Sequence, residues 1–320
     1  MSEFGFILEN EIQKILTNKR LLISLVAIVV AVLVMAVSLA GDPTNENWRE
    51  YLEKQIIDSQ EWIAELSTDL NENRELIVEE QQIIALYRYQ LDNNYPPTES
   101  VFKFVFDSLG MESILILLTI TTTAFVVCNE YTNRTILPLL TSGYRRRDIV
   151  IAKILVAAIY SVMILIAYFV ISVVVGIIFF SKNGFATTYL VIENNAIVQK
   201  DISVQIISAF AIVLLRLITY LTITFCVAVI TKSQTATITA MIIIWILGGA
   251  SISILSIDYR WIELILLYSL EVLSDSLTTH ISWASREIQH ALMNCLVSSL
   301  LFIATSILGF CRKPLPNKAN

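Results

Sequence analysis

The sequence predicts an all-α integral membrane protein with six transmembrane helices. Hydrophobic residues make up 56% of the 320-residue chain and charged residues only 16%, whereas a soluble domain usually carries about 25% charged residues. A helix that crosses the hydrocarbon core of a bilayer needs roughly 20 consecutive apolar residues. Six stretches meet or approach this length: 21–40, 113–128, 154–180, 205–230, 235–257 and 291–310. A soluble protein with six such helices would have almost nothing with which to cover them.

The positions of Lys and Arg predict the orientation of these spans, because short cytoplasmic loops are enriched in both residues. One side of a six-span arrangement holds twelve of them: Lys14, Lys19, Arg20, Arg134, Arg145, Arg146, Arg147, Lys153, Lys232, Arg312, Lys313 and Lys318. The short loops of the other side hold Lys182, Lys200, Arg260 and Arg286. We therefore expect a multi-pass protein with both termini in the cytoplasm.

Residues 1–20 are expected to form an amphipathic helix in the membrane interface, followed by the first span at 21–40. Apolar residues fall on one face of that helix, and Glu11 and Lys14 lie elsewhere on it. A helix with one apolar and one charged face lies in the plane of the interface rather than across the bilayer.

Residues 41–108 predict an extracellular helical domain. They contain fifteen acids against five bases, a net charge of −10. Ile or Leu recurs every seven residues, which is a helical, coiled-coil-like period, at Ile56, Ile63, Leu70, Ile77, Ile84 and Leu91. We expect two antiparallel helices at 45–68 and 73–92, and one long helix is the alternative. The segment would be either a structural cap or a receptor or lid for an extracellular ligand.

The rest of the chain, 109–320, is expected to hold spans two to six, a cytoplasmic loop at 129–153 and a short cytoplasmic tail. Residues 258–287, between spans five and six, are too apolar for a free loop. Trp261 and Tyr268 lie on one face there, and both residue types favour the membrane interface. A short re-entrant helical pair fits this segment.

The sequence carries no motif for catalysis, metal binding or nucleotide binding. A phosphate-binding loop needs a Gly-Lys pair, and the chain has none. It also lacks the His-Glu-x-x-His zinc motif and the Gly-x-Ser-x-Gly nucleophile elbow. The four cysteines and two histidines do not have the spacing of a zinc site. We expect no enzyme activity and no cofactor of its own.

The loop after the second span carries a distinctive series of residues. An acid closes the span, and a Leu-Leu-Thr run, an Arg and a later Lys follow it. The positions are Glu130, Thr135, Leu139, Leu140, Thr141, Arg145 and Lys153. With this series the loop resembles the corresponding loop of the ABC (ATP-binding-cassette) type-2 export permeases. Arg134 stands where the family has Gly, and Ser142-Gly143-Tyr144 replaces a turn that contains Pro.

The family uses this segment as a coupling helix that docks on a separate ATPase. In this chain Arg146 and Arg147 extend the basic flank beside Arg145. The three arginines also suit contact with anionic lipid. Glu11 and Lys14 resemble positions in the family's connecting helix. Residues 258–287 resemble the re-entrant helical pair of the same family.

The resemblance implies the membrane subunit of an exporter in the cell membrane of a prokaryote. A cytoplasmic ATPase partner would bind ATP and Mg, and a second membrane subunit would complete a homodimer or heterodimer. The substrate would be amphiphilic, such as an antimicrobial peptide, a lipid or a drug, and nucleic acid is not an expected partner. The alternative is an ABC-coupled sensor or force transmitter that uses the extracellular helices without transport.

Arg216 lies inside the fourth predicted span, between two leucines. Charges at membrane depth are costly and face the bundle interior or a cavity. Arg216 is therefore expected to contact an anionic substrate or Glu112, at the outer part of span two, as part of a substrate path. A purely structural ion pair is the alternative.

Overall fold

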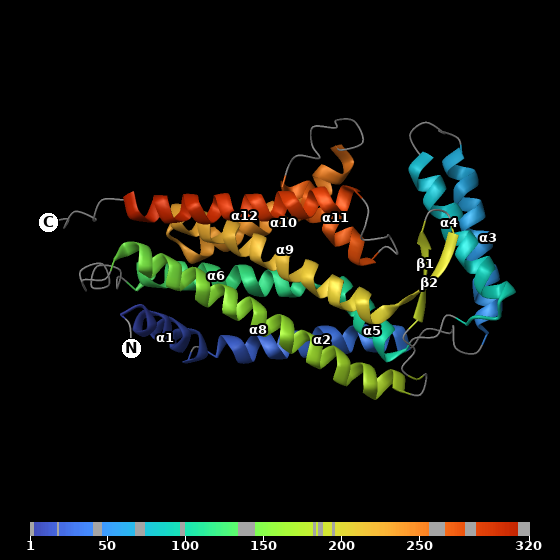
Figure 1. Cartoon of the computed structure of the whole chain (residues 1–320), viewed down its shortest axis with the longest axis horizontal. Helices are drawn as coiled ribbons and strands as arrows, with labels where there is room; N and C mark the ends of the chain where they lie inside the picture. The colour runs from blue at the N-terminus through green and yellow to red at the C-terminus, as the bar shows by residue number, and fades with distance from the viewer. Residues whose placement is uncertain are drawn as a thin grey trace.

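The computed structural model describes residues 3–17, 19–40, 47–67, 74–96, 100–133, 145–181, 184, 188–193, 196–255, 266–278 and 286–312. Figure 1 shows the long helices side by side, with both chain ends at one end of the bundle and a smaller group of helices and strands at the other. The long helices are α2 (Arg20–Ala40), α6 (Ser113–Thr132), α8 (Arg146–Phe180), α9 (Ile202–Thr231), α10 (Gln234–Leu255) and α12 (Arg286–Arg312).

Five of these helices, α2, α6, α8, α9 and α12, are long and apolar enough to cross a membrane. They overlap five of the six predicted spans. The sixth, α10, qualifies as a shorter apolar helix over Gln234–Ile246. The chain is thus a helical membrane protein. With 35 residues, α8 is about 52 Å long, so it exceeds a hydrocarbon core of about 30 Å.

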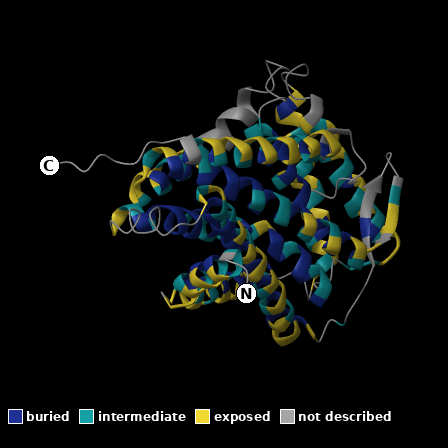
Figure 2. Ribbon diagram, turned by 60° about the vertical axis from the view of Figure 1, so that its left-hand side comes forward, coloured by how far each residue is buried: buried dark blue, intermediate teal, exposed yellow. Residues whose placement is uncertain are grey.

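Burial divides the bundle into a centre and a periphery, which Figure 2 shows as dark blue inside and yellow outside. Most of α6 and α9 is buried, whereas α2, α8 and α12 are buried on a minority of positions. The outward faces of these three helices carry large apolar side chains, such as Leu22, Ile166 and Leu300. Extended apolar exposure of this kind is rare on soluble monomers, and lipid is its natural environment here.

Two helices, α3 (Trp48–Leu66) and α4 (Arg74–Asp92), occupy the acidic segment. They pack against each other, and an Arg49 Nη2 hydrogen bond to Asn94 Oδ1 of 2.8 Å joins the start of one to the end of the other. The hairpin therefore replaces the single long helix as the correct alternative. Ile84 is the buried member of the predicted heptad stripe, and Leu52 and Leu66 of the neighbouring stripe are buried too.

The fold is predominantly helical, as expected of an all-α membrane protein, and a small two-stranded antiparallel sheet adds to it. Strands β1 (Thr188–Glu193) and β2 (Ala196–Asp201) pair with Val191 opposite Val198. Both strands are rich in β-branched residues, which favour extended structure. The sheet lies between α8 and α9, where the sequence analysis had assigned only a loop. Asp201 then accepts a hydrogen bond from the Ser203 N–H at 2.9 Å and caps α9.

The predicted extracellular domain is too long at its C-terminal end. Its last residues form α5 (Val101–Ser108), which packs against α8 and α9 inside the bundle. Phe104 and Val105 of α5 are fully buried in the main hydrophobic core. A hydrogen bond from the Lys103 N–H to Ser100 Oγ of 3.2 Å begins this helix, and the 3₁₀ helix η3 (Leu109–Met111) connects it to α6.

The N-terminal helix α1 (Glu3–Thr17) packs on α8 and α2. Apolar Leu8, Ile12 and Ile15 contribute to this contact as expected, but Glu11, predicted to lie off the apolar face, is buried too. The glutamate therefore points inward, a placement that its ion pairs explain below. Lys19, with φ of 53°, lies in the left-handed region between α1 and α2.

Of the predicted re-entrant pair, the structure describes α11 (Leu266–Thr278). Its buried side chains include Leu270 and Leu273, and it packs against α10 and α12. Trp261 lies outside the described residues.

Close packing of α5 on α8 depends on Gly176. A Cβ at Gly176 would lie 3.1 Å from Phe104 Cδ1, whereas a Cβ at Gly309 of α12 would lie 3.7 Å from its nearest neighbour. Overpacking of a core commonly costs about 1–3 kcal/mol. We expect Gly176→Ala to unfold at a lower temperature than the control Gly309→Ala in detergent. Equal midpoints would contradict the tight α5–α8 contact.

Candidate functional site

Four charged residues from three helices meet at the end of the bundle that holds the chain termini. Glu11 and Lys14 come from α1, Glu130 from the last turn of α6 and Lys153 from the start of α8. Lys14 Nζ lies 2.6 Å from Glu11 Oε1 and 2.9 Å from Glu130 Oε1. Lys153 Nζ lies 3.2 Å from Glu11 Oε2 and 3.0 Å from Glu130 Oε1. We call these four residues the charge clasp.

Local helix geometry explains how the clasp assembles. Residues three or four apart lie on the same face of a helix, so Glu11 and Lys14 are neighbours on α1, and Ile7 and Ile15 flank Glu11 on the buried side. Lys153 follows the buried Ile149 and Val150 by one turn of α8. Its burial is therefore imposed by the face that α8 turns toward α1 and α6.

Burial makes the clasp electrostatically demanding. Glu11, Glu130 and Lys153 are only 2–3% exposed, and an isolated buried charge is very unfavourable. Lys153 has three N–H groups, and the third acceptor is Val126 O, at 2.8 Å. Two positive and two negative charges balance in the clasp. Lys14 pairs with Glu11 within α1, and Lys153 of α8 pairs with Glu130 of α6. The Lys14–Glu130 and Lys153–Glu11 contacts join α1 to both of these helices.

Lys14 is the partly exposed member of the clasp. Burial acts to lower the pKa of its amino group, but hydrogen bonds and charge interactions with Glu11 and Glu130 outweigh that effect and raise the pKa above its ordinary value. Lys14 therefore stays protonated over the physiological pH range.

The clasp leaves no room for a substrate. The space among its side chains has a volume of about 10 Å³, which is about enough for one water molecule. The arrangement is therefore a joint between helices and not a binding pocket.

The clasp lies at the two ends of the segment 129–153, which resembles a coupling helix. Glu130 stands at its start and Lys153 at its end. Thr135, Leu139, Leu140 and Thr141 lie outside the described residues. Arg145 and Arg147 are exposed where α8 begins, and Arg146 is half-buried.

A second ion pair lies within the bundle, where Arg216 of α9 contacts Glu112 just before α6. Both residues are 2% exposed. Ser274 of α11 donates a hydrogen bond to Glu112 Oε1 at 3.1 Å. The structure thus brings the two predicted partners together and adds α11 to them, so the pair joins three elements.

The charge of Arg216 also affects the pKa values of two carboxylates of α11. Glu271 and Asp275 are one turn apart on α11; Glu271 is half-buried and Asp275 is exposed. Burial raises the pKa of both, the Asp275 charge raises that of Glu271 further, and Arg216 partly offsets both increases. The sequence analysis did not single out Ser274, Glu271 or Asp275. Two acids in the apolar segment 258–287 could have indicated a nearby basic partner.

The described residues contain no group of three or more His, Cys, Asp or Glu side chains arranged to hold a metal ion. Cys128, Cys226 and Cys295 are free thiols within helices.

The fold and the two ion-pair sites define a helical membrane protein whose helices are joined by buried charges. The chain belongs to the family described as "Protein of unknown function (DUF2705)", which matches residues 75–315. The matched range contains Glu112, Glu130, Lys153 and Arg216. The chain is also similar to the "Uncharacterized protein YhcI" of Bacillus subtilis (strain 168), with 21% identity over 237 residues that cover 73% of each chain.

Removal of one charge from the clasp should destabilise the protein strongly. Breaking a buried ion pair costs about 3–5 kcal/mol, so Lys153→Met should lower the free energy of unfolding by about that amount in mixed detergent micelles. Adding Glu130→Gln should cost less than the sum of the two single changes, because it restores neutrality. The control is Lys103→Met, whose Asp107 partner is 3.9 Å away and partly exposed. Strict additivity of the two changes would contradict the clasp.

The α11 carboxylates predict a pH dependence of stability. Their raised pKa values mean that the folded protein binds more protons than the unfolded one, so their contribution to stability falls as pH rises from about 4. The variant Glu271→Gln/Asp275→Asn should therefore gain stability relative to wild type as pH increases, in thermal unfolding measured at several pH values. Parallel curves for the two proteins would refute this assignment.

Proposed function

We propose that this chain is the membrane permease subunit of an ABC exporter, energised by a separate cytoplasmic ATPase that binds ATP and Mg. The observation that carries the proposal is the charge clasp. Four residues singled out for their resemblance to ABC type-2 permeases, Glu11, Lys14, Glu130 and Lys153, come together as one buried cluster. They surround the two ends of the loop that resembles a coupling helix.

The clasp suits the transmission of force. An ATPase that closes on nucleotide must act on a rigid body outside the lipid. Because α1, α6 and α8 share the same four charges, a displacement of the loop between α6 and α8 would move all three helices together. The exposed Arg145 and Arg147 offer ionic anchors for the ATPase, and the half-buried Arg146 supports the start of α8.

The proposed architecture has six spans, with α10 as the fifth, and a re-entrant pair that includes α11. Both termini and the clasp would be cytoplasmic, and α3, α4, β1 and β2 would lie outside the cell membrane of a prokaryote. A second membrane subunit, identical or different, would complete the transport unit. The substrate would be amphiphilic, such as an antimicrobial peptide, a lipid or a drug.

Arg216 and Glu112 serve best as a positioning pair within this exporter. Their charges cancel, and Ser274 fills a further acceptor position on Glu112. The pair ties α11 to the centre of the bundle, so that movement of α6 or α9 is passed to it.

A sensor or force transmitter without transport is the second candidate. It is favoured by one observation, which is a groove of about 560 Å³ beside the α3–α4 hairpin. In that case the ATPase would act on the outer helices through α2 and α6.

Docking of an ATPase can be tested at the exposed arginines. We expect Arg145→Glu/Arg147→Glu to reduce copurification of a soluble ATPase with the tagged chain several-fold, because charge reversal places repulsion at a docking surface. The measurement is the stoichiometry of the two polypeptides after affinity purification in mild detergent.

The matched control is Lys19→Glu/Lys232→Glu, which makes the same change in net charge at two exposed positions of the same predicted side. It should leave the stoichiometry unchanged, and both variants should insert in the membrane at wild-type levels. Wild-type recovery of the ATPase with the arginine variant would count against docking at this loop.

A further inference from the structure

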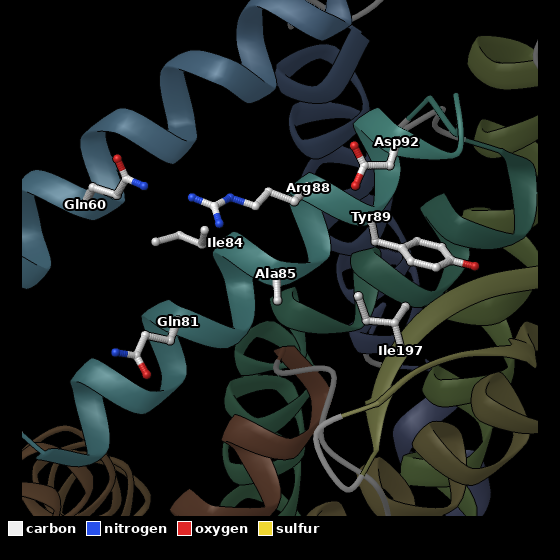
Figure 3. Close-up of a pocket in the computed structure, with 8 residues that line it drawn as sticks. All are labelled: Gln60, Gln81, Ile84, Ala85, Arg88, Tyr89, Asp92 and Ile197. Carbon is white, nitrogen blue, oxygen red and sulfur yellow. The ribbon is translucent and has the colours of Figure 1, made fainter.

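A groove lies beside the α3–α4 hairpin, at the end of the molecule opposite the chain termini (Figures 1 and 3). Its volume is about 560 Å³, and α3, α4 and β2 all contribute to its walls. Ligand pockets commonly measure about 300–1,000 Å³. The groove therefore has the size of a small-ligand site, in contrast to the closed clasp.

Arg88 of α4 reaches across this groove. Figure 3 shows its guanidinium extending from α4 toward α3, where the Gln60 side chain points back at it. Within the part of the chain that the structure describes, Arg88 forms no ion pair. A guanidinium presents five donors in a planar fork that matches a carboxylate. Arg88 and Gln60 therefore converge as donors on a space that an anionic group can fill.

Asp92, one turn from Arg88 on α4, also lines the groove. Residues four apart on a helix can pair, yet these two do not, since Arg88 is directed toward α3 (Figure 3). The groove thus offers separate sites for a negative and a positive group.

The remaining lining residues combine apolar and amide side chains. Ile84 is buried, and Tyr89 and Ile197 are half-buried, so they can cover an apolar side chain of a ligand. Gln81 supplies a second amide, in addition to that of Gln60. Amide side chains donate and accept hydrogen bonds, as peptide groups do.

We propose that this groove binds the C-terminal end of a basic, apolar peptide, with Arg88 and Gln60 holding its terminal carboxylate. Asp92 holds a basic group of the peptide, and Ile84, Tyr89 and Ile197 cover an apolar side chain. The surrounding segment, residues 41–108, has a net charge of −10. That charge attracts a basic peptide from solution, whereas Arg88 orients it once it arrives.

Peptide binding is a property of this chain alone and does not depend on an ATPase, so its test is separate from the test of export. The probe is a dye-labelled peptide, Lys-Ala-Leu-Phe, with either a free C-terminal carboxylate or a C-terminal amide. Binding is measured by fluorescence anisotropy to the full-length chain in lipid nanodiscs.

We expect saturable binding of the free-acid peptide and at least about fivefold weaker binding of the amidated peptide, because a charge-assisted hydrogen bond is lost. The Arg88→Gln variant should bind the free-acid peptide more weakly by a similar factor and should bind the amidated peptide with unchanged affinity. Added salt should weaken the binding of both peptides, since it screens their attraction to the acidic segment.

The control variant is Lys54→Gln, which removes one positive charge from an exposed position of α3 outside the groove. This variant should bind the free-acid peptide and the amidated peptide with the same affinities as the wild-type protein. Equal affinity of the free-acid and amidated peptides, or equal effects of Arg88→Gln and Lys54→Gln, would overturn the proposal. Absence of saturable peptide binding would do the same, including when inorganic phosphate binds instead.

Discussion

The charge clasp is the interaction on which the arrangement of the end of the bundle that holds the chain termini depends. Buried charges are tolerated only when they are paired and hydrogen-bonded, and the pairs here join α1, α6 and α8. Glu130 and Lys153 join α6 to α8, and the contacts of Lys14 and Glu11 with them add α1 to the same cluster. The N-terminal helix is therefore bound to the bundle by charge as well as by apolar contact, and the loop between α6 and α8 starts and ends at fixed points.

The Arg216–Glu112 pair plays the corresponding part nearer the other end of α6. It joins α9 to the start of α6, and Ser274 extends the contact to α11. The central helix α6 is thus held by ion pairs at both of its ends, while apolar packing surrounds its middle. Through these contacts α6 connects the clasp at one of its ends to α9 and α11 at the other.

Much of this organisation could be predicted from the sequence because hydrophobic length and periodicity are strong signals. Long apolar runs predicted five helices that are long and apolar enough to cross a membrane, and the heptad of Ile and Leu predicted the helices α3 and α4. The burial of Glu11 in α1 was not predicted, because its charge assigned it to the polar face of the helix. Its burial depends on Lys153, which lies 142 residues away, and no local pattern reports such a pairing. The β1–β2 hairpin was missed because two six-residue strands give little periodicity beside the long helices. The close packing of α5 on α8 requires a residue without a side chain at Gly176. No local sequence pattern reports such a contact between two helices.

The central claim is that this chain works as the membrane partner of a separate ATPase. The most direct test is to purify the full-length chain in mild detergent from cells that normally express it. ATP turnover is then measured before and after a high-salt wash that strips soluble subunits. The account predicts turnover in the intact complex, none in the stripped chain, and recovery when the stripped fraction is added back. ATP hydrolysis that stays with the stripped chain, or an intact preparation with neither a soluble subunit nor turnover, would contradict it.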